Sequence, residues 1–160
     1  MDKLLLFIDG SVSAKTKVGY GAYLLIDGAE LKLEAVKSQV QLRRFEDTSS
    51  TKLELRTLIW ALSEIEEVQK KVKVFTDSQN IVSLKTRRSF LEENDYRTKT
   101  SKILTNHELY RDFFKQVDRL DCEFVKLKGH KPSEEKDEFD LLFTLVDQAC
   151  RRALRKEMKS

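Results

Sequence analysis

The chain has 160 residues, of which 40% are hydrophobic and 36% are charged, a balance typical of one globular domain with a substantial core. One proline and five glycines exclude a low-complexity arm, and the apolar runs are too short to cross a bilayer. The net charge of +3 is modest but uneven, since residues 80–131 and 149–160 are basic, which fits either a solvated surface or a polyanion partner.

The N-terminus and the cysteines bear on the compartment. The sequence begins Met-Asp-Lys and passes at once into a strand pattern, so we predict no signal peptide. Cys122 and Cys150 are too few for a disulfide framework, and we expect both to be reduced and buried, as in a cytoplasmic protein. We expect one domain over residues 1–160, monomeric, without membrane contact and complete as a stand-alone chain.

The first part of the chain has the pattern of three strands joined by hairpins. Residues 3–9 are almost continuously apolar, and residues 18–27 form a second apolar run that ends at the turn sequence DGAE. Residues 31–42 alternate apolar and polar over part of their length, which predicts a half-exposed third strand. Apolar residues then recur at helical spacing from Leu53 to Val68, after cap candidates at residues 49–51.

Strands and helices alternate in the rest of the chain. The predicted elements are a strand over 72–76, a helix over 78–91, a loop or broken helix over 92–105, a helix over 106–120 capped by Asn106, a strand over 122–127, a loop over 128–135 and a helix over 134–156. This order predicts an α/β fold with a five-stranded mixed sheet, three antiparallel strands and then two parallel ones, flanked by helices.

Four acidic residues lie where such a sheet would bring them together. Asp9 closes the first strand and Asp77 closes the fourth, and the ends of parallel strands are where chemistry gathers. Glu54 opens the first helix, and Asp147 lies inside the apolar pattern of the last one. Close like charges destabilise a fold unless cations are present, and an oxygen-rich cluster suits Mg²⁺ or Mn²⁺ rather than zinc.

Each acidic residue also has a structural explanation when it is taken alone. Asp9 could start a turn, and Asp77 could cap the helix that follows it. Glu54 would be favoured in a first helical turn by the helix dipole, and Asp147 could border a solvated face. The order of the four along the predicted elements is what favours a shared site.

The order of these motifs resembles that of the type 1 ribonuclease H family. The matching segments are FIDGS (Phe7–Ser11), LELRTLIWAL (Leu53–Leu62), FTDSQ (Phe75–Gln79), LKGH (Leu127–His130) and VDQACRRAL (Val146–Leu154). They follow the family's order over nearly the whole chain, and the combination of DGS, TDSQ and KGH is more specific than any one of them. The resemblance implies a ribonuclease H-like fold, which agrees with the sheet predicted from the residue pattern.

The resemblance implies a metal-dependent endonuclease that cuts the RNA strand of RNA–DNA hybrids and leaves 5′-phosphate and 3′-hydroxyl ends. Asp9, Glu54, Asp77 and Asp147 would hold two ions of Mg²⁺, or alternatively Mn²⁺, with Asp9 bridging them. Asp147 would help hold the ion that activates the attacking water, and Glu54 and Asp77 the ion beside the leaving 3′ oxygen. His130 would assist proton transfer or product release.

The resemblance also implies a set of substrate-binding residues. They are Gly10, Ser11, Lys15, Ser49, Ser50, Thr51, Gln79, Arg87 and Arg88. Gln79 matches a family residue that contacts the minor groove, and residues 49–51 occupy a stretch where relatives carry threonine and asparagines. Arg87 and Arg88 lie in the basic run 85–102, which could bind phosphates or be a solvated loop.

Some assignments stay open at the level of the sequence. Asp137, Glu138 and Asp140 compete with Asp147 as the fourth metal ligand, and the resemblance favours Asp147, because the apolar residues and alanines around it match the family's last helix. The basic tail over residues 149–160 would cover a solvated face or, alternatively, contact phosphates. The alternative functions are a non-catalytic nucleic-acid-binding module on the same fold and another metal nuclease of the superfold.

Overall fold

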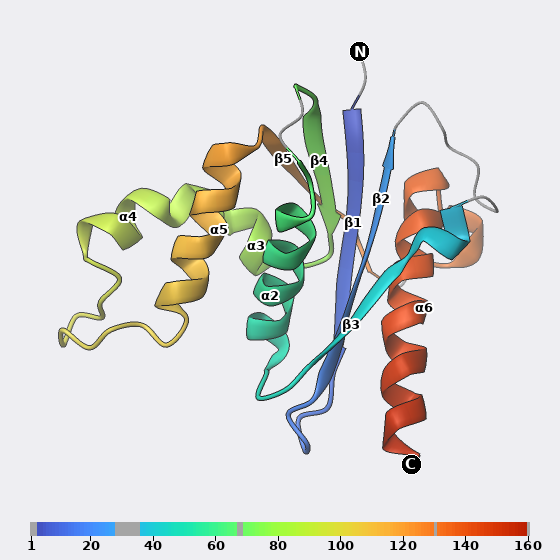
Figure 1. The fold of residues 1–160 in the computed structure, drawn as a ribbon, viewed down its shortest axis with the longest axis horizontal. Coiled ribbons are helices and arrows are strands. Elements are labelled where there is room, and N and C mark those ends of the chain that lie inside the picture. The colour runs from blue at the N-terminus through green and yellow to red at the C-terminus, as the bar shows by residue number, and fades with distance from the viewer. Residues whose placement is uncertain (1–2, 28–35, 67–68, 130, 160) are drawn as a thin grey trace.

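The computed structural model describes residues 3–27, 36–66, 69–129 and 131–159, and its centre is a five-stranded sheet with helices on both faces (Figure 1). The strand order is β3-β2-β1-β4-β5. β1 (Lys3–Val12), β2 (Gly19–Asp27) and β3 (Gln41–Phe45) pair antiparallel. β4 (Lys71–Thr76) and β5 (Cys122–Lys126) continue the sheet in parallel with β1. The predicted mixed sheet is therefore confirmed.

The helices form two unequal layers. One layer contains α2 (Ser50–Ser63), α3 (Gln79–Leu84), α4 (Arg88–Glu93) and α5 (His107–Arg119), and Figure 1 shows α2 and α5 on the opposite side of the sheet from α6 (Glu138–Met158). Short 3₁₀ turns lie at Lys37–Gln39, Lys85–Arg87 and Ser133–Glu135. Within the described ranges, no helix is both long and apolar enough to cross a membrane.

The alternation of side chains along β1 divides the core in two. Leu6 and Ile8 pack with α2 and α5, whereas Leu5 and Phe7 pack with α6. Because both faces of this strand are buried, its sequence is almost continuously apolar. Cys122 belongs to the first core and Cys150 to the second, and both are buried free thiols.

The third strand lies later in the chain than the sequence predicts. Of the expected range 31–42, residues 31–35 fall outside the described part, and Lys37–Gln39 forms a 3₁₀ turn. The strand is Gln41–Phe45, an edge strand whose side chains are largely exposed. The strand pattern is hard to recognise in this polar sequence, because one of its contacts is made by a charged residue. The Arg43 guanidinium stacks over the rings of Phe45 and Trp60.

The helix predicted over 78–91 is interrupted. α3 ends at Leu84 and α4 begins at Arg88, with a 3₁₀ turn between them. The Ser83 hydroxyl donates to the Asn80 carbonyl and the Thr86 hydroxyl to the Ser83 carbonyl, and such local bonds compete with the regular helical pattern.

Smaller differences concern the ends of helices. α2 ends at Ser63, so the prediction that the helix continues through Ile65 is wrong. Val68, the last residue of the predicted pattern, lies outside the described residues. Asn106 flanks α5 as predicted, but its side chain makes no capping hydrogen bond. The last helix begins at Glu138 rather than near 134, because Asp137 and Asp140 form a capping box there.

Candidate active site

One open hollow gathers four acidic side chains, from β1, α2, the end of β4 and α6. Its lining includes Asp9, Glu54, Asp77 and Asp147. Three of the predicted substrate-binding residues, Gly10, Ser11 and Ser50, line the same hollow. The convergence expected from the order of the motifs is thus present in the fold.

Asp9 faces α6 because it follows Leu5 and Phe7 at a spacing of two along β1. The pKa of Asp9 is raised to about 9, first by burial and then by a hydrogen bond to the Asp147 side chain and the nearby charge of Asp77. A carboxyl group with such a pKa keeps its proton at neutral pH unless a cation replaces it. Asp9 is therefore the most strongly perturbed acid of the cluster.

Glu54 reaches the hollow because α2 lies unusually close to the sheet. A Cβ atom built on Gly10 would come within 2.8 Å of Leu53 Cδ2, and one on Gly21 within 2.0 Å of Thr57 Oγ1, so glycines at both positions allow this approach. The Glu54 carboxylate then accepts hydrogen bonds from the hydroxyls of Ser78 and Ser50. Burial raises the pKa of Glu54, and these two hydrogen bonds oppose the rise.

Asp77 follows the last residue of β4 and lies next to the loop after β5. A Cβ atom on Gly129 would lie 3.6 Å from Asp77 Oδ2. The residue after Asp77, Ser78, accepts a hydrogen bond from the Ile81 amide as N-cap of α3 while its hydroxyl donates to Glu54. The TDSQ segment therefore presents one acid to the hollow and orients another.

Asp147 is the acidic residue of α6 that lies beside Asp9. Its Oδ1 accepts a hydrogen bond from Arg151 Nε at 2.9 Å. Two of the competing candidates have other partners, since Asp137 caps α6 and Asp140 accepts from the Asp137 amide and from Lys131 Nζ. Asp147 as the fourth ligand remains a prediction, and the geometry supports it over Asp137 and Asp140.

The donor atoms of the hollow fit a hard divalent cation. Carboxylate oxygens are the ligands that Mg²⁺ and Mn²⁺ prefer, and the crowding that raises the pKa of Asp9 is what a bound cation would relieve. Among the described residues, Cys150 Sγ also lies within 4.8 Å of oxygens of Asp9 and Asp147. Burial and these two acids raise the pKa of the Cys150 thiol, so it remains a protonated, apolar neighbour.

The other predicted substrate-binding residues lie apart from this hollow. Ser49 is the N-cap of α2, and its side chain accepts from the Lys52 amide; Thr51 is exposed on the same helix. Gln79 accepts a hydrogen bond from Lys126 Nζ, and Lys15 is exposed in the β1–β2 loop.

The two predicted arginines of the basic run are engaged within the protein. Arg87 donates to the Asn80 side chain, and Arg88 pairs with both Asp118 and Glu92. His130 lies outside the described residues. Substrate binding by the two arginines and the catalytic role of His130 stay predictions.

Two residues that hold the acids of the hollow, Ser78 and Arg151, were not among the predicted site residues. Ser78 appears in the TDSQ motif, but its bond to Glu54 joins residues far apart in the chain. Arg151 could have been found, because it stands four residues after Asp147, a spacing that places side chains together on a helix.

Known proteins resemble this chain over most of its length. The RNase H family model matches residues 1–149. A ribonuclease H of Moorella thermoacetica is 25% identical over 156 residues, covering 95% of this chain and 96% of the relative. One of Clostridium botulinum strain Hall is 23% identical over 145 residues, covering 89% and 93%.

A solved structure, the foamy viral protease-reverse transcriptase in complex with dsDNA, shares the fold with a TM-score of 0.67 at 14% identity, covering 92% of this chain and 93% of that one. The family match spans both ends of the sheet and all four acidic positions. The chain therefore belongs to the RNase H family.

Proposed function

We propose that this protein is a divalent-metal-dependent endonuclease that hydrolyses the RNA strand of RNA–DNA hybrids and leaves 5′-phosphate and 3′-hydroxyl ends. The observation that carries the proposal is the convergence of Asp9, Glu54, Asp77 and Asp147 on one open hollow. The relatives named ribonuclease H support the reaction class. The viral relative, which was solved with dsDNA, supports a nucleic-acid duplex as the partner.

The four carboxylates would hold Mg²⁺, with Mn²⁺ as the alternative ion. Bound there, divalent ions would make water more acidic and stabilise negative charge on the attacking and leaving oxygens of the phosphodiester. Asp9 is the residue whose proton must leave when a cation binds, because its pKa is raised to about 9 in the protein alone. Metal affinity should therefore increase with pH through the neutral range.

The neighbours of the carboxylates would keep them ready for this task. Ser78 and Ser50 hold the Glu54 carboxylate from two sides, which limits its rotation before substrate arrives. Arg151 balances the charge of Asp147. Ser11 and Ser50 add hydroxyl groups to the lining, and these can hydrogen-bond to phosphate or to the 2′-hydroxyls that distinguish RNA from DNA.

His130 would assist proton transfer from the loop after β5. We expect His130→Ala to lower kcat on the order of 10²-fold, the lower end of the range for general acid–base catalysis, with little change in KM. Steady-state cleavage of a labelled hybrid would measure this. His107→Gln, on α5 and remote from the hollow lining, is the matched control; a complete loss of turnover in His130→Ala would show that the histidine does more than assist.

Four labelled duplexes of one sequence test the proposal directly: RNA–DNA, RNA–RNA, DNA–DNA, and DNA with one ribonucleotide. Each is incubated in Mg²⁺, in Mn²⁺ and in chelator, with the wild type and with Asp77→Asn. We expect cutting of the hybrid's RNA strand alone, dependent on metal and absent in the variant. Salt-sensitive binding of the hybrid without any cutting would instead identify a non-catalytic binding module.

A further inference from the structure

The last turns of α6 carry a cationic side chain, Arg155, that lines the hollow. Arg151 and Arg155 both line the hollow, and their spacing of four residues places them on one side of the helix. Arg151 pairs with Asp147. The Arg155 guanidinium makes no hydrogen bond or ion pair with any residue in the described ranges.

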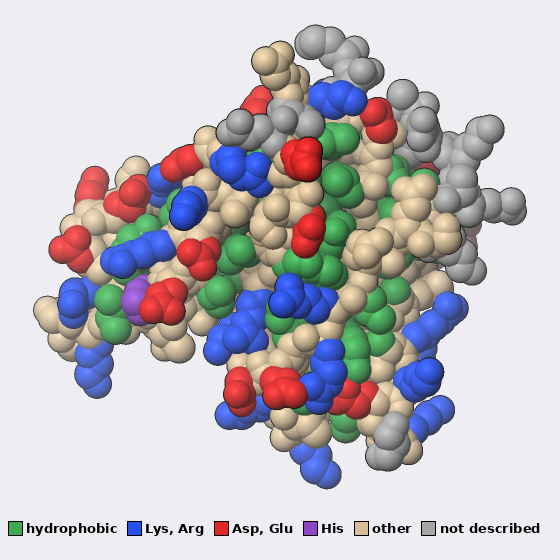
Figure 2. Space-filling model, viewed as in Figure 1, with side chains coloured by type: hydrophobic (Ala, Val, Ile, Leu, Met, Phe, Trp, Pro, Cys, Tyr) green, Lys and Arg blue, Asp and Glu red, His purple; other side chains and the backbone are tan. Residues whose placement is uncertain are grey.

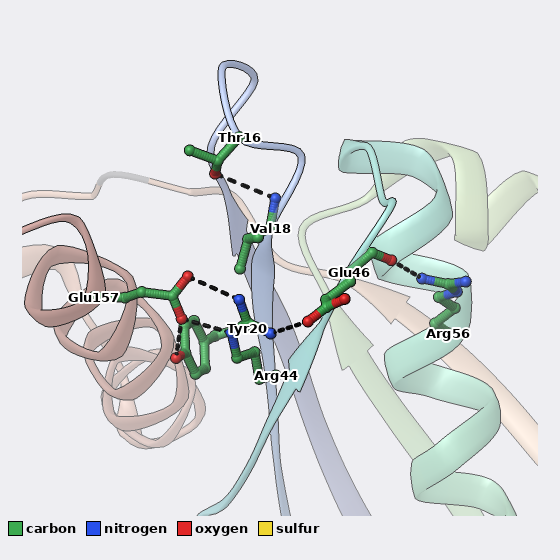
Figure 3. A network of polar contacts seen from close by, with 7 residues as sticks. All are labelled: Thr16, Val18, Tyr20, Arg44, Glu46, Arg56 and Glu157. Carbon is green, nitrogen blue, oxygen red and sulfur yellow. Dashed lines mark hydrogen bonds and ion pairs between the residues drawn. The ribbon is translucent and has the colours of Figure 1, made fainter. Parts of the chain in front are cut away.

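The one acidic residue in this part of the sequence points to another side of the helix. From residue 149 onward the sequence contains five Lys or Arg residues and a single acid, Glu157. Tyr20 Oη on β2 donates to Glu157 Oε1 at 2.6 Å, and Arg44 on β3 donates to both Glu157 oxygens at 2.6 and 3.2 Å (Figure 3). Glu157 therefore faces the sheet, and its spacing of two residues from Arg155 places the two side chains on different sides of α6.

The same contacts fix the end of the helix. Terminal turns of helices usually fray, yet here a two-point arginine–carboxylate pair and a tyrosine hydroxyl join the last turn of α6 to β2 and β3. Arg44 is itself oriented by a further bond to Glu46 on the other side (Figure 3). Figure 2 shows Lys and Arg side chains along the edge of the molecule that α6 forms. Arg155 thus projects from a fixed helix end in a basic surface.

We propose that Arg155 binds a backbone phosphate of the nucleic-acid strand that enters the hollow, at a linkage other than the one that is cut. The contacts of Glu157 with Tyr20 and Arg44 position Arg155, because they hold the end of α6 against the sheet. The inference rests on the proposed function, because the strand is the substrate of that site. The four carboxylates of the hollow repel the phosphates of an entering nucleic-acid strand unless cationic groups lie at the rim of the hollow. An exposed guanidinium at that rim supplies affinity without sequence preference.

Binding of a labelled RNA–DNA hybrid, measured by fluorescence anisotropy in Mg²⁺, tests the subsite. The measurement uses the Asp77→Asn background so that cutting cannot interfere. We expect Arg155→Ala to weaken binding on the order of 5-fold at low salt and to reduce the slope of log Kd against log salt by about 0.7–0.9, the value for one lost phosphate contact. In the cutting enzyme the same change should raise KM and leave kcat within about 2-fold.

Arg152→Ala is the matched control, since Arg152 is an exposed arginine on the same helix that does not line the hollow. Equal effects of Arg152→Ala and Arg155→Ala would overturn the proposal, because net charge alone would then account for both. Unchanged binding in Arg155→Ala would overturn it as well. Weakened binding in Arg155→Ala, with a wild type that leaves the hybrid uncut, would overturn the proposed function and support the subsite.

The positioning role has a charge-neutral test. Tyr20→Phe removes the hydroxyl that donates to Glu157 and changes no charge. We expect it to weaken hybrid binding about 2- to 3-fold when Arg155 is present and not when Arg155 is alanine, the non-additivity of residues that act together. Equal weakening in both backgrounds would show that the tyrosine does not act through Arg155.

Discussion

Replacing Asp9 by asparagine is expected to abolish turnover and, in metal-free buffer, to stabilise the protein. The amide cannot balance the charge of a cation, so we expect kcat to fall by on the order of 10³-fold or more. Without metal, the wild type must take up a proton at Asp9 when it folds at neutral pH with this side chain beside Asp147 and Asp77, and asparagine removes that cost. We expect the free energy of unfolding at pH 7 to rise by about 1–3 kcal/mol.

The pH dependence of this gain follows from the raised pKa of Asp9. The folded protein holds the Asp9 proton up to about pH 9, whereas the unfolded chain releases it near the ordinary value of 3.8. The free energy of unfolding of the wild type therefore falls as pH rises from 3.8 toward 9. The asparagine variant has no proton to release at this position, so its free energy of unfolding does not fall for this reason. The difference between the two should be small at pH 4 and largest above neutrality.

Urea unfolding in chelator at a series of pH values would measure both effects. Adding Mg²⁺ should stabilise the wild type more than Asp9→Asn, because binding to the native state alone raises stability. Asp112→Asn, an exposed acid on α5, is the control and should leave activity and stability near wild type. A variant that is less stable than the wild type in chelator would contradict the repulsion described for the cluster.

Gly21→Ala is expected to destabilise the fold by about 2–3 kcal/mol, the range for inserting a group into a filled core. The new Cβ would lie 2.0 Å from Oγ1 and 3.0 Å from Cβ of Thr57, which is fully buried and donates its hydroxyl to the Leu53 carbonyl. α2 would have to move away from the sheet, and Glu54 would move with it. We therefore expect cleavage activity to fall beyond the loss of folded protein.

Thermal and urea unfolding of two companion variants would test this explanation. Gly129→Ala is the matched glycine replacement, because its nearest atom would be Asp77 Oδ2 at 3.6 Å, and it should change stability by less than about 0.5 kcal/mol. Thr57→Ala removes the closest atom, so the double variant should show a favourable coupling of about 1 kcal/mol. Additive effects of the two substitutions would mean that the steric account is wrong.

The elements that could be predicted from sequence are those whose burial is visible in the pattern of apolar residues. β1 is buried on both faces and is almost continuously apolar. β4 alternates lysine and valine before Phe75, and the acids that follow the two strands mark the functional edge. β3 could not be found at its true position, because it is an exposed edge strand whose arginine packs on aromatic rings. The interruption between α3 and α4 depends on hydroxyl bonds that apolar periodicity does not register.

Some residues of the candidate site could likewise be predicted from the sequence, and others required the fold. Asp9 and Asp77 follow from strand ends, and Glu54 from the start of a helix, but the choice of Asp147 depended on resemblance until the fold placed it beside Asp9. The contacts of Glu157 join residues separated by 113 and 137 positions in the chain. No local pattern encodes such a pair, because both partners are ordinary polar residues on elements whose relative position only the packed sheet determines.

The division of the core by the sheet also has a consequence for the order in which the nuclease matures. Glu54 belongs to the helix packed on one face, whereas Asp147 belongs to α6 on the other face, and α6 is made after all five strands during translation. A growing chain that has completed β1, α2 and β4 can present three acids but not the fourth. Full assembly of the carboxylates must await docking of the final helix, so the synthesis order itself delays catalytic competence until the domain is closed on both sides.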